Sequence, residues 1–137
     1  MVKFKSYLIA VILGIALAFV SVVIVSYGAA VAIPADILNP VAQISGLLAF
    51  TLVDLFTIAV PLAAAFLIVA FASKLVISKP DFIFYALLLA PLVLLQLYFV
   101  AQSQPHMFNN IVTTLPRILL LAGCFYFLVR SSQRANA

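Results

Sequence analysis

One carboxylate, Asp54, lies inside a long apolar segment and is the residue of this chain best placed to do chemistry. The segment covers residues 43–73, longer than the about 20 apolar residues that a helix needs to cross a bilayer. An ionisable side chain within such a helix is costly and marks a functional site by default. If the helix enters the membrane near Ile44, Asp54 lies about 15 Å below the outer edge, close to the midplane.

Other oxygen-bearing groups gather around this carboxylate. Thr51 and Thr57 lie three residues to either side of Asp54. Pro61 has no amide hydrogen, so the carbonyl of Thr57, four residues back, loses its helical partner. These oxygens lie within about two helical turns and suit a proton, a small cation or a polar part of a substrate. The alternative is that Asp54 is neutral or hydrogen-bonded and packs against a neighbouring helix.

Two polar residues of later apolar segments are candidate partners for Asp54. Gln96 lies at a similar depth in the third segment. Arg117 lies about 5 Å inside the outer edge if its helix begins near residue 114, and helical side chains tilt toward the helix N-terminus. That tilt directs Arg117 outward. Gln96 is therefore the expected partner, and an ion pair with Arg117 requires the fourth helix to sit lower.

Arg117 also suggests a separate anion site. Together with Thr113 and Thr114 it forms a predicted helix N-terminus, where free amides and a guanidinium favour an anion. At the membrane surface this anion would be a lipid phosphate, either ordinary or polyprenyl-linked. The alternative is an interfacial arginine in contact with bulk lipid.

Catalytic and metal-binding arrangements have little support. The three acidic residues, Asp36, Asp54 and Asp81, fall in separate parts of the chain, too far apart for an aspartyl dyad. The single histidine, His106, belongs to a predicted polar loop, and the single cysteine, Cys124, to the last apolar segment. We expect no enzymatic activity, no metal and no cofactor.

The overall composition is that of an integral membrane protein. Of 137 residues, 68% are hydrophobic and 7% are charged, and the mean hydropathy is +1.37. A soluble domain has about a quarter of its residues charged. The net charge of +4 comes from basic residues at the ends of apolar runs, where lipid headgroups attract them. Membrane lipids are therefore the expected partners, and nucleic acid is not.

The apolar runs predict an all-α, four-transmembrane-helix bundle that forms a single domain over residues 1–137. Proline residues bracket a short interfacial turn at 34–39 in the first connection. The predicted spans are about 6–27, 44–72, 82–101 and 114–130.

The first span carries a face of small residues. Ala10, Gly14 and Ala18 recur every four residues, which lets another helix approach closely. The alternative is that such residues are simply frequent in membrane helices. Residues 30–32 also resemble a signal-peptidase site, but the apolar run before them is longer than an ordinary signal core, so we interpret it as a span.

Basic residues predict the orientation. With four spans, both termini and the central connection lie on the side that holds nearly all the positive charge, and the positive-inside rule makes that side cytoplasmic. A bacterial inner membrane is the expected location. The basic residues on this side are Lys3, Lys5, Lys74, Lys79, Arg130 and Arg134.

These features favour a non-catalytic role. We expect a small subunit or accessory of a membrane complex, which packs against itself as a homo-oligomer or against a larger membrane protein. Three alternatives stay open: a small oligomeric transporter or channel that uses Asp54, a binder of an anionic lipid at Arg117, and an immunity protein against a membrane-active toxin.

Overall fold

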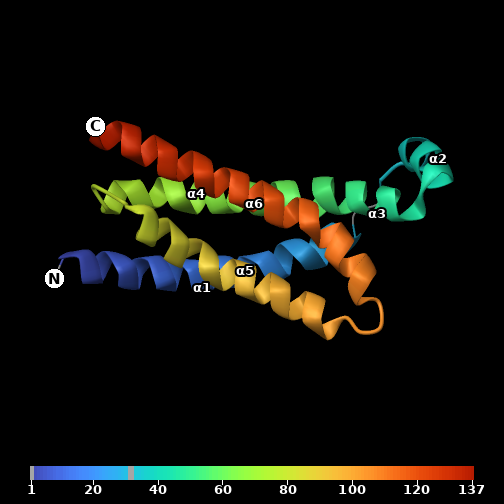
Figure 1. Ribbon diagram of the computed structural model, residues 1–137, viewed down its shortest axis with the longest axis horizontal. Coiled ribbons are helices and arrows are strands. Elements are labelled where there is room, and N and C mark those ends of the chain that lie inside the picture. Colours follow the sequence, from blue (N-terminus) through green and yellow to red (C-terminus); the bar gives the residue numbers. More distant parts are fainter. Residues whose placement is uncertain (1, 31–32) are drawn as a thin grey trace.

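The computed structural model describes residues 2–30 and 33–137, and every regular element in these ranges is a helix (Figure 1). The predicted all-helical architecture is confirmed. Val31 and Ala32 of the signal-peptidase-like sequence lie outside the described residues. The elements are α1 (Val2–Ala30), α2 (Ala35–Ile44), α3 (Gly46–Asp54), the π-helical turn η1 (Leu55–Ala59), α4 (Val60–Val76), α5 (Phe82–Gln102) and α6 (Met107–Asn136).

Four helical segments in the described part of the chain are long and apolar enough to cross a membrane, as predicted. One of them is the continuous run α3, η1 and α4, and the others are α1, α5 and α6. They lie lengthwise beside one another, with both termini at one end, here called the terminal end (Figure 1). The opposite end, with α2 and the α5–α6 loop, is called the distal end.

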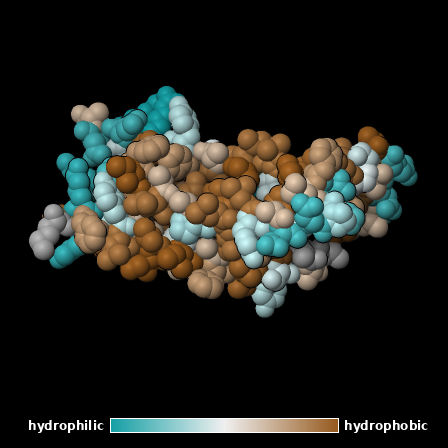
Figure 2. All heavy atoms as spheres, turned by 60° about the horizontal axis from the view of Figure 1, so that its bottom comes forward, coloured by the Kyte–Doolittle hydropathy of each residue, from teal (hydrophilic) through white to brown (hydrophobic). Residues whose placement is uncertain are grey.

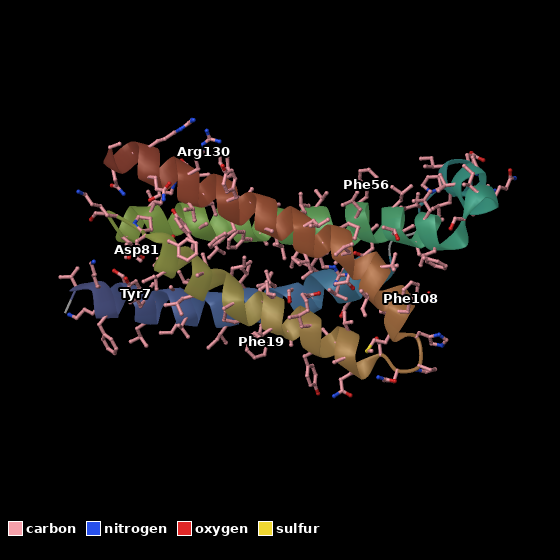
Figure 3. All side chains as sticks on the ribbon, viewed as in Figure 1. Tyr7, Phe19, Phe56, Asp81, Phe108 and Arg130 are labelled. Atoms are coloured by element: carbon pink, nitrogen blue, oxygen red, sulfur yellow. The ribbon has the colours of Figure 1, made fainter. Side chains whose placement is uncertain are left out.

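The hydrophobic and hydrophilic residues of the surface are distributed differently in the middle of the bundle and at its two ends. On the face shown in Figure 2, hydrophobic residues cover most of the middle of the bundle, and hydrophilic residues gather toward its two ends. Large aromatic side chains point away from the bundle, among them Phe19, Phe56 and Phe108, which are 73%, 64% and 72% exposed (Figure 3). An apolar surface of this extent suits contact with lipid rather than water.

Close contact between α1 and α5 organises the interior. Ala10, Gly14 and Ala18 are buried on one face of α1. A Cβ atom added to Gly14 would lie 2.7 Å from the carbonyl oxygen of Leu88 and 3.0 Å from that of Leu87, both on α5. The two backbones therefore touch at Gly14, as small residues at membrane helix interfaces allow. Buried large side chains complete the core: Leu17, Leu62, Phe66, Phe84, Tyr85, Leu88, Leu92, Leu121 and Leu128.

Two helical boundaries differ from the predicted ones at the distal end. Helix α6 begins at Met107, well before the predicted start near residue 114. The amide hydrogens in the first turn of a helix have no helical partner and are satisfied by polar side chains or water. Asn109 and Asn110 are therefore compatible with the start of a helix. The predicted interfacial turn at 34–39 is instead the ten-residue helix α2, which has no buried residue.

The terminal end is fastened by hydrogen bonds between elements. The Tyr7 hydroxyl of α1 donates to Asp81 at 2.8 Å, and Asp81 also caps α5 by accepting from the Phe84 amide at 2.9 Å (Figure 3). The Ser132 hydroxyl of α6 donates to the carbonyl of Pro80 at 2.6 Å. Helix α6 continues to Asn136, beyond the predicted end at residue 130, and Ser132 in this extension contacts the α4–α5 connection.

Candidate functional site

Arg117 joins two polar side chains from other helices. Its Nε donates to Oδ2 of Asp54 at 3.3 Å, and its Nη2 forms an ion pair with Oδ1 of the same carboxylate. Its Nη1 donates to Oε1 of Gln96. The Arg117 and Asp54 side chains are only 9% and 13% exposed. Three guanidinium N–H groups are thus used inside the bundle.

The network continues to the first helix. Nε2 of Gln96 donates to Oγ of Ser21 at 3.4 Å, and the Ser21 hydroxyl donates to the carbonyl of Ala18 at 2.6 Å. Asp54 ends α3, Arg117 belongs to α6, Gln96 to α5 and Ser21 to α1. The four side chains, here called the polar cluster, therefore connect all four spanning segments.

The partner of Asp54 is Arg117, whereas the sequence favoured Gln96. Because α6 begins at Met107, Arg117 lies ten residues into the helix, or about 15 Å along its axis. The fourth helix thus extends further at the distal end than expected, and the guanidinium reaches Asp54 without opposing the tilt of its side chain. Gln96 contacts the arginine instead of the acid.

The polar cluster lies toward the distal end of the bundle. Gln96 precedes the end of α5 at Gln102 by six residues, or about 9 Å. Since the middle of α5 falls at Leu92, Gln96 lies in the distal half of the helix, between its middle and its distal end. The midplane position expected for Asp54 assumed that the membrane edge coincides with Ile44, but that residue belongs to α2.

A π-helical turn follows Asp54 directly. Residues Leu55–Ala59 form η1, and the amide of Val60 donates to the carbonyl of Leu55, five residues back. The turn precedes Pro61, whose ring clashes with the Thr57 carbonyl in a regular α-helix, so the wider turn relieves that clash. Gly28 of α1 packs there, because an added Cβ would lie 2.7 Å from the Thr57 carbonyl oxygen.

The threonines near Asp54 are bonded within their own helix. The Thr51 hydroxyl donates to the Leu47 carbonyl at 2.8 Å, and the Thr57 hydroxyl donates to the Val53 carbonyl at 2.7 Å. Their hydrogen bonds therefore do not involve the carboxylate. The expected group of oxygens around Asp54 is replaced by the side chains of the polar cluster.

The proposed anion site at the start of the fourth helix has a different environment from the expected one. Because α6 begins at Met107, Thr113 and Thr114 lie inside the helix, where the amides have helical partners. The Thr113 hydroxyl donates to the Asn110 carbonyl at 3.3 Å, and Thr114 is buried. The guanidinium of Arg117 is occupied by Asp54 and Gln96. The expected combination of free amides and a free guanidinium does not form at these residues.

A cleft of about 780 Å³ opens beside the polar cluster. Asp54 and Thr57 line this cleft, and so does Gly46 at the start of α3. His106 also lines the cleft, so the histidine that the sequence assigned to a loop faces the same space as the acid. The cleft gives the Asp54 site a connection to the surroundings of the bundle.

One residue of the polar cluster and two residues of the cleft were not predicted from the sequence. Ser21 follows Ala18 by three residues and extends the small-residue face, a spacing that already placed it toward another helix. Asn109 and Asn110, which line the cleft, were predicted to belong to a loop.

Cys124 is half-buried in α6. No group of three His, Cys, Asp or Glu residues that suits a metal occurs in the described residues.

Comparison of this chain with protein-family models, curated proteins and solved structures gives no match.

Proposed function

We propose that this chain is a small, non-catalytic subunit or accessory of a membrane complex, with both termini in the cytoplasm of a bacterial cell. The observation that supports this role most is the polar cluster. Asp54 and Arg117 neutralise each other, and Gln96 and Ser21 continue the network to the remaining helices. The chain thus uses its strongest intramembrane polar groups to hold its helices in a fixed arrangement.

The apolar surface of the bundle supports a partner within the lipid plane. Interfaces in membranes depend on shape and packing, because lipid tails are as apolar as the side chains they replace. A bundle held by a buried ion pair presents a constant outer shape to such a partner. The partner is either a second copy of the chain or a larger membrane protein.

Purification in a mild detergent tests this role. A C-terminally tagged chain, cross-linked in membranes before extraction, should yield a discrete homo-oligomer or a membrane protein in fixed ratio. Arg117→Met should reduce that assembly, because it removes the ion pair, whereas the matched control Arg130→Ala changes only an exposed residue. A monomer without a companion, before and after cross-linking, would contradict the proposal.

The cleft beside Asp54 favours a second candidate, a small carrier or channel. It brings an open space of about 780 Å³ to a carboxylate that is otherwise held by Arg117. A proton or a small cation that reaches Asp54 would compete with the guanidinium for the same oxygens.

Proton flux into proteoliposomes with an internal pH-sensitive dye tests the second candidate. Asp54→Asn should abolish flux with normal expression, and Arg130→Ala should retain it. Equal flux for the wild type and Asp54→Asn, or none above empty vesicles, would exclude proton transport through this carboxylate. The cross-linking result above does not depend on this outcome.

A further inference from the structure

The cleft beside the polar cluster has two chemically different walls. Its apolar wall comes from α3 and η1, and its polar wall comes from the start of α6. The apolar wall consists of Leu47, Phe50, Val53 and Ile58. The polar wall consists of His106, Asn109, Asn110 and Thr113. Positions 106, 109, 110 and 113 have the spacing of residues on one face of a helix, so this face of α6 is polar along its first two turns.

The position of the cleft suits an amphiphile. It runs from Gly46 at the distal end of α3 to Ile58 in η1, so it spans the depth between the helix entrance and the polar cluster. Its volume of about 780 Å³ falls within the roughly 300–1,000 Å³ of small-molecule sites. Apolar and hydrogen-bonding groups therefore line the same cleft at the distal end of the spanning segments, where a lipid beside a spanning bundle would change from chain to headgroup.

The charges of the lining residues indicate which kind of lipid headgroup would fit the cleft. Among the described residues that line the cleft there is no lysine or arginine, and the one carboxylate, Asp54, is paired with Arg117. An anionic headgroup would find neither a lysine nor an arginine among these residues. The carboxamides of Asn109 and Asn110 make no side-chain hydrogen bond to any described residue, and a carboxamide both donates and accepts. Hydroxyl groups match such a lining because they also donate and accept.

We propose that this cleft binds an uncharged amphiphile whose headgroup carries several hydroxyls, such as a glycosylated lipid. The headgroup hydroxyls bond to the asparagines and to His106, and the chains lie along Phe50 and its apolar neighbours. The site shares Asp54 and one face of α6 with the polar cluster, but lipid binding and assembly are tested separately, because the variants below leave the ion pair of Asp54 with Arg117 in place.

The glycines provide a matched pair of variants. A Cβ atom added to Gly46 meets nothing within 4 Å, so Gly46→Leu places a side chain at the cleft without an initial clash. Gly123 on α6 is equally open and does not line the cleft, so Gly123→Leu is the control. Asn110→Ala removes one carboxamide and leaves the polar cluster intact.

Native mass spectrometry of the protein from phosphatidylcholine nanodiscs measures the binding. The probe is monoglucosyl diacylglycerol, compared with phosphatidylglycerol at equal mole fraction. The wild type and Gly123→Leu should retain one glucolipid, whereas Gly46→Leu and Asn110→Ala should lower retention about tenfold. Preferential retention of phosphatidylglycerol, equal retention of both lipids, or equal glucolipid retention by all four proteins would overturn the proposal.

Discussion

Arg117 is the residue on which the interior depends most. A buried ion pair is stable only where the geometry is good and further hydrogen bonds satisfy the remaining groups. Here the guanidinium bonds to both oxygens of Asp54 and to Gln96, so neither charge is left alone. The removal of one partner leaves a buried polar group with no compensation.

Replacement of Arg117 should therefore destabilise the protein strongly. We expect Arg117→Met to lower the free energy of unfolding by about 3 kcal/mol, because Asp54 stays buried without its cation. The double variant Asp54→Leu with Arg117→Met should recover most of that loss, since apolar groups of similar size often replace a buried pair well. Unfolding in mixed micelles with a denaturing detergent measures both. A double variant at least as unstable as Arg117→Met would contradict the buried-pair argument.

Asp81 gives the terminal end a pH dependence. Burial alone would raise the pKa of this carboxyl, but hydrogen bonds from the Phe84 amide and the Tyr7 hydroxyl, together with the nearby Lys3 charge, outweigh burial and lower the pKa overall. A folded pKa below the unfolded value of about 3.9 contributes stability above that value. This contribution is lost as the pH falls through the folded pKa.

We expect the wild type to lose thermal stability between about pH 4 and pH 2 more steeply than Asp81→Asn does. Tyr7→Phe removes one of the two donors and should give an intermediate slope. Thermal unfolding in detergent across this range measures all three proteins. Parallel curves for the wild type and Asp81→Asn would show that these hydrogen bonds do not favour the ionised form.

At the scale of the elements, the close contact of α1 with α5 is possible because Gly14 has no side chain. An added Cβ at Gly14 would lie 2.7 Å from the Leu88 carbonyl oxygen and 3.0 Å from Cγ of Pro91. Backbone atoms cannot rotate away as a side chain does, so one of the two helices has to move. The same holds for Gly28 against the π-helical turn η1.

Gly14→Ala should therefore lower the free energy of unfolding by about 1–3 kcal/mol, although alanine is the better helix former. Gly123→Ala is the matched control, because an added Cβ meets nothing within 4 Å there. It should leave stability unchanged or raise it by up to about 1 kcal/mol. Detergent unfolding of the two variants measures the difference, and equal stabilities would argue against the close α1–α5 contact.

At the scale of the whole molecule, both termini lie at the terminal end (Figure 1). The lysines and arginines other than Arg117 belong to the parts of the helices and connections nearest that end. Lys3 and Lys79 line a pocket of about 340 Å³ there together with Asp81. By the positive-inside rule, this end is the cytoplasmic one in the proposed orientation.

Thiol labelling of intact cells tests that orientation. In a Cys124→Ser background, a membrane-impermeant maleimide should label Gln104→Cys in the α5–α6 loop and not Ser78→Cys before α5. Both positions are exposed, so accessibility depends on the side of the membrane. Permeabilised cells provide the control, in which both react. Labelling of Ser78→Cys and not of Gln104→Cys would contradict the proposed orientation.

Much of the fold is determined by local sequence. Long apolar runs predict spanning helices, and the spacing of Ala10, Gly14 and Ala18 predicts a closely packed face, because both signals repeat within a single helix. Polar residues at a helix start are harder to interpret. Asn109 and Asn110 suit a loop and a first turn equally well, so the start of α6 was displaced in the prediction.

The tertiary structure decided which polar groups meet. The sequence by itself determined that Asp54, Gln96 and Arg117 lie in apolar segments and need partners, since a polar group in lipid is costly wherever its helix packs. The pairing depends on where along its axis each helix meets the next. A shift of one turn moves a side chain by about 5.4 Å, more than the length of an ion pair. Only the packed bundle fixes that register, and it joins Asp54 to Arg117 and Gln96 to Ser21.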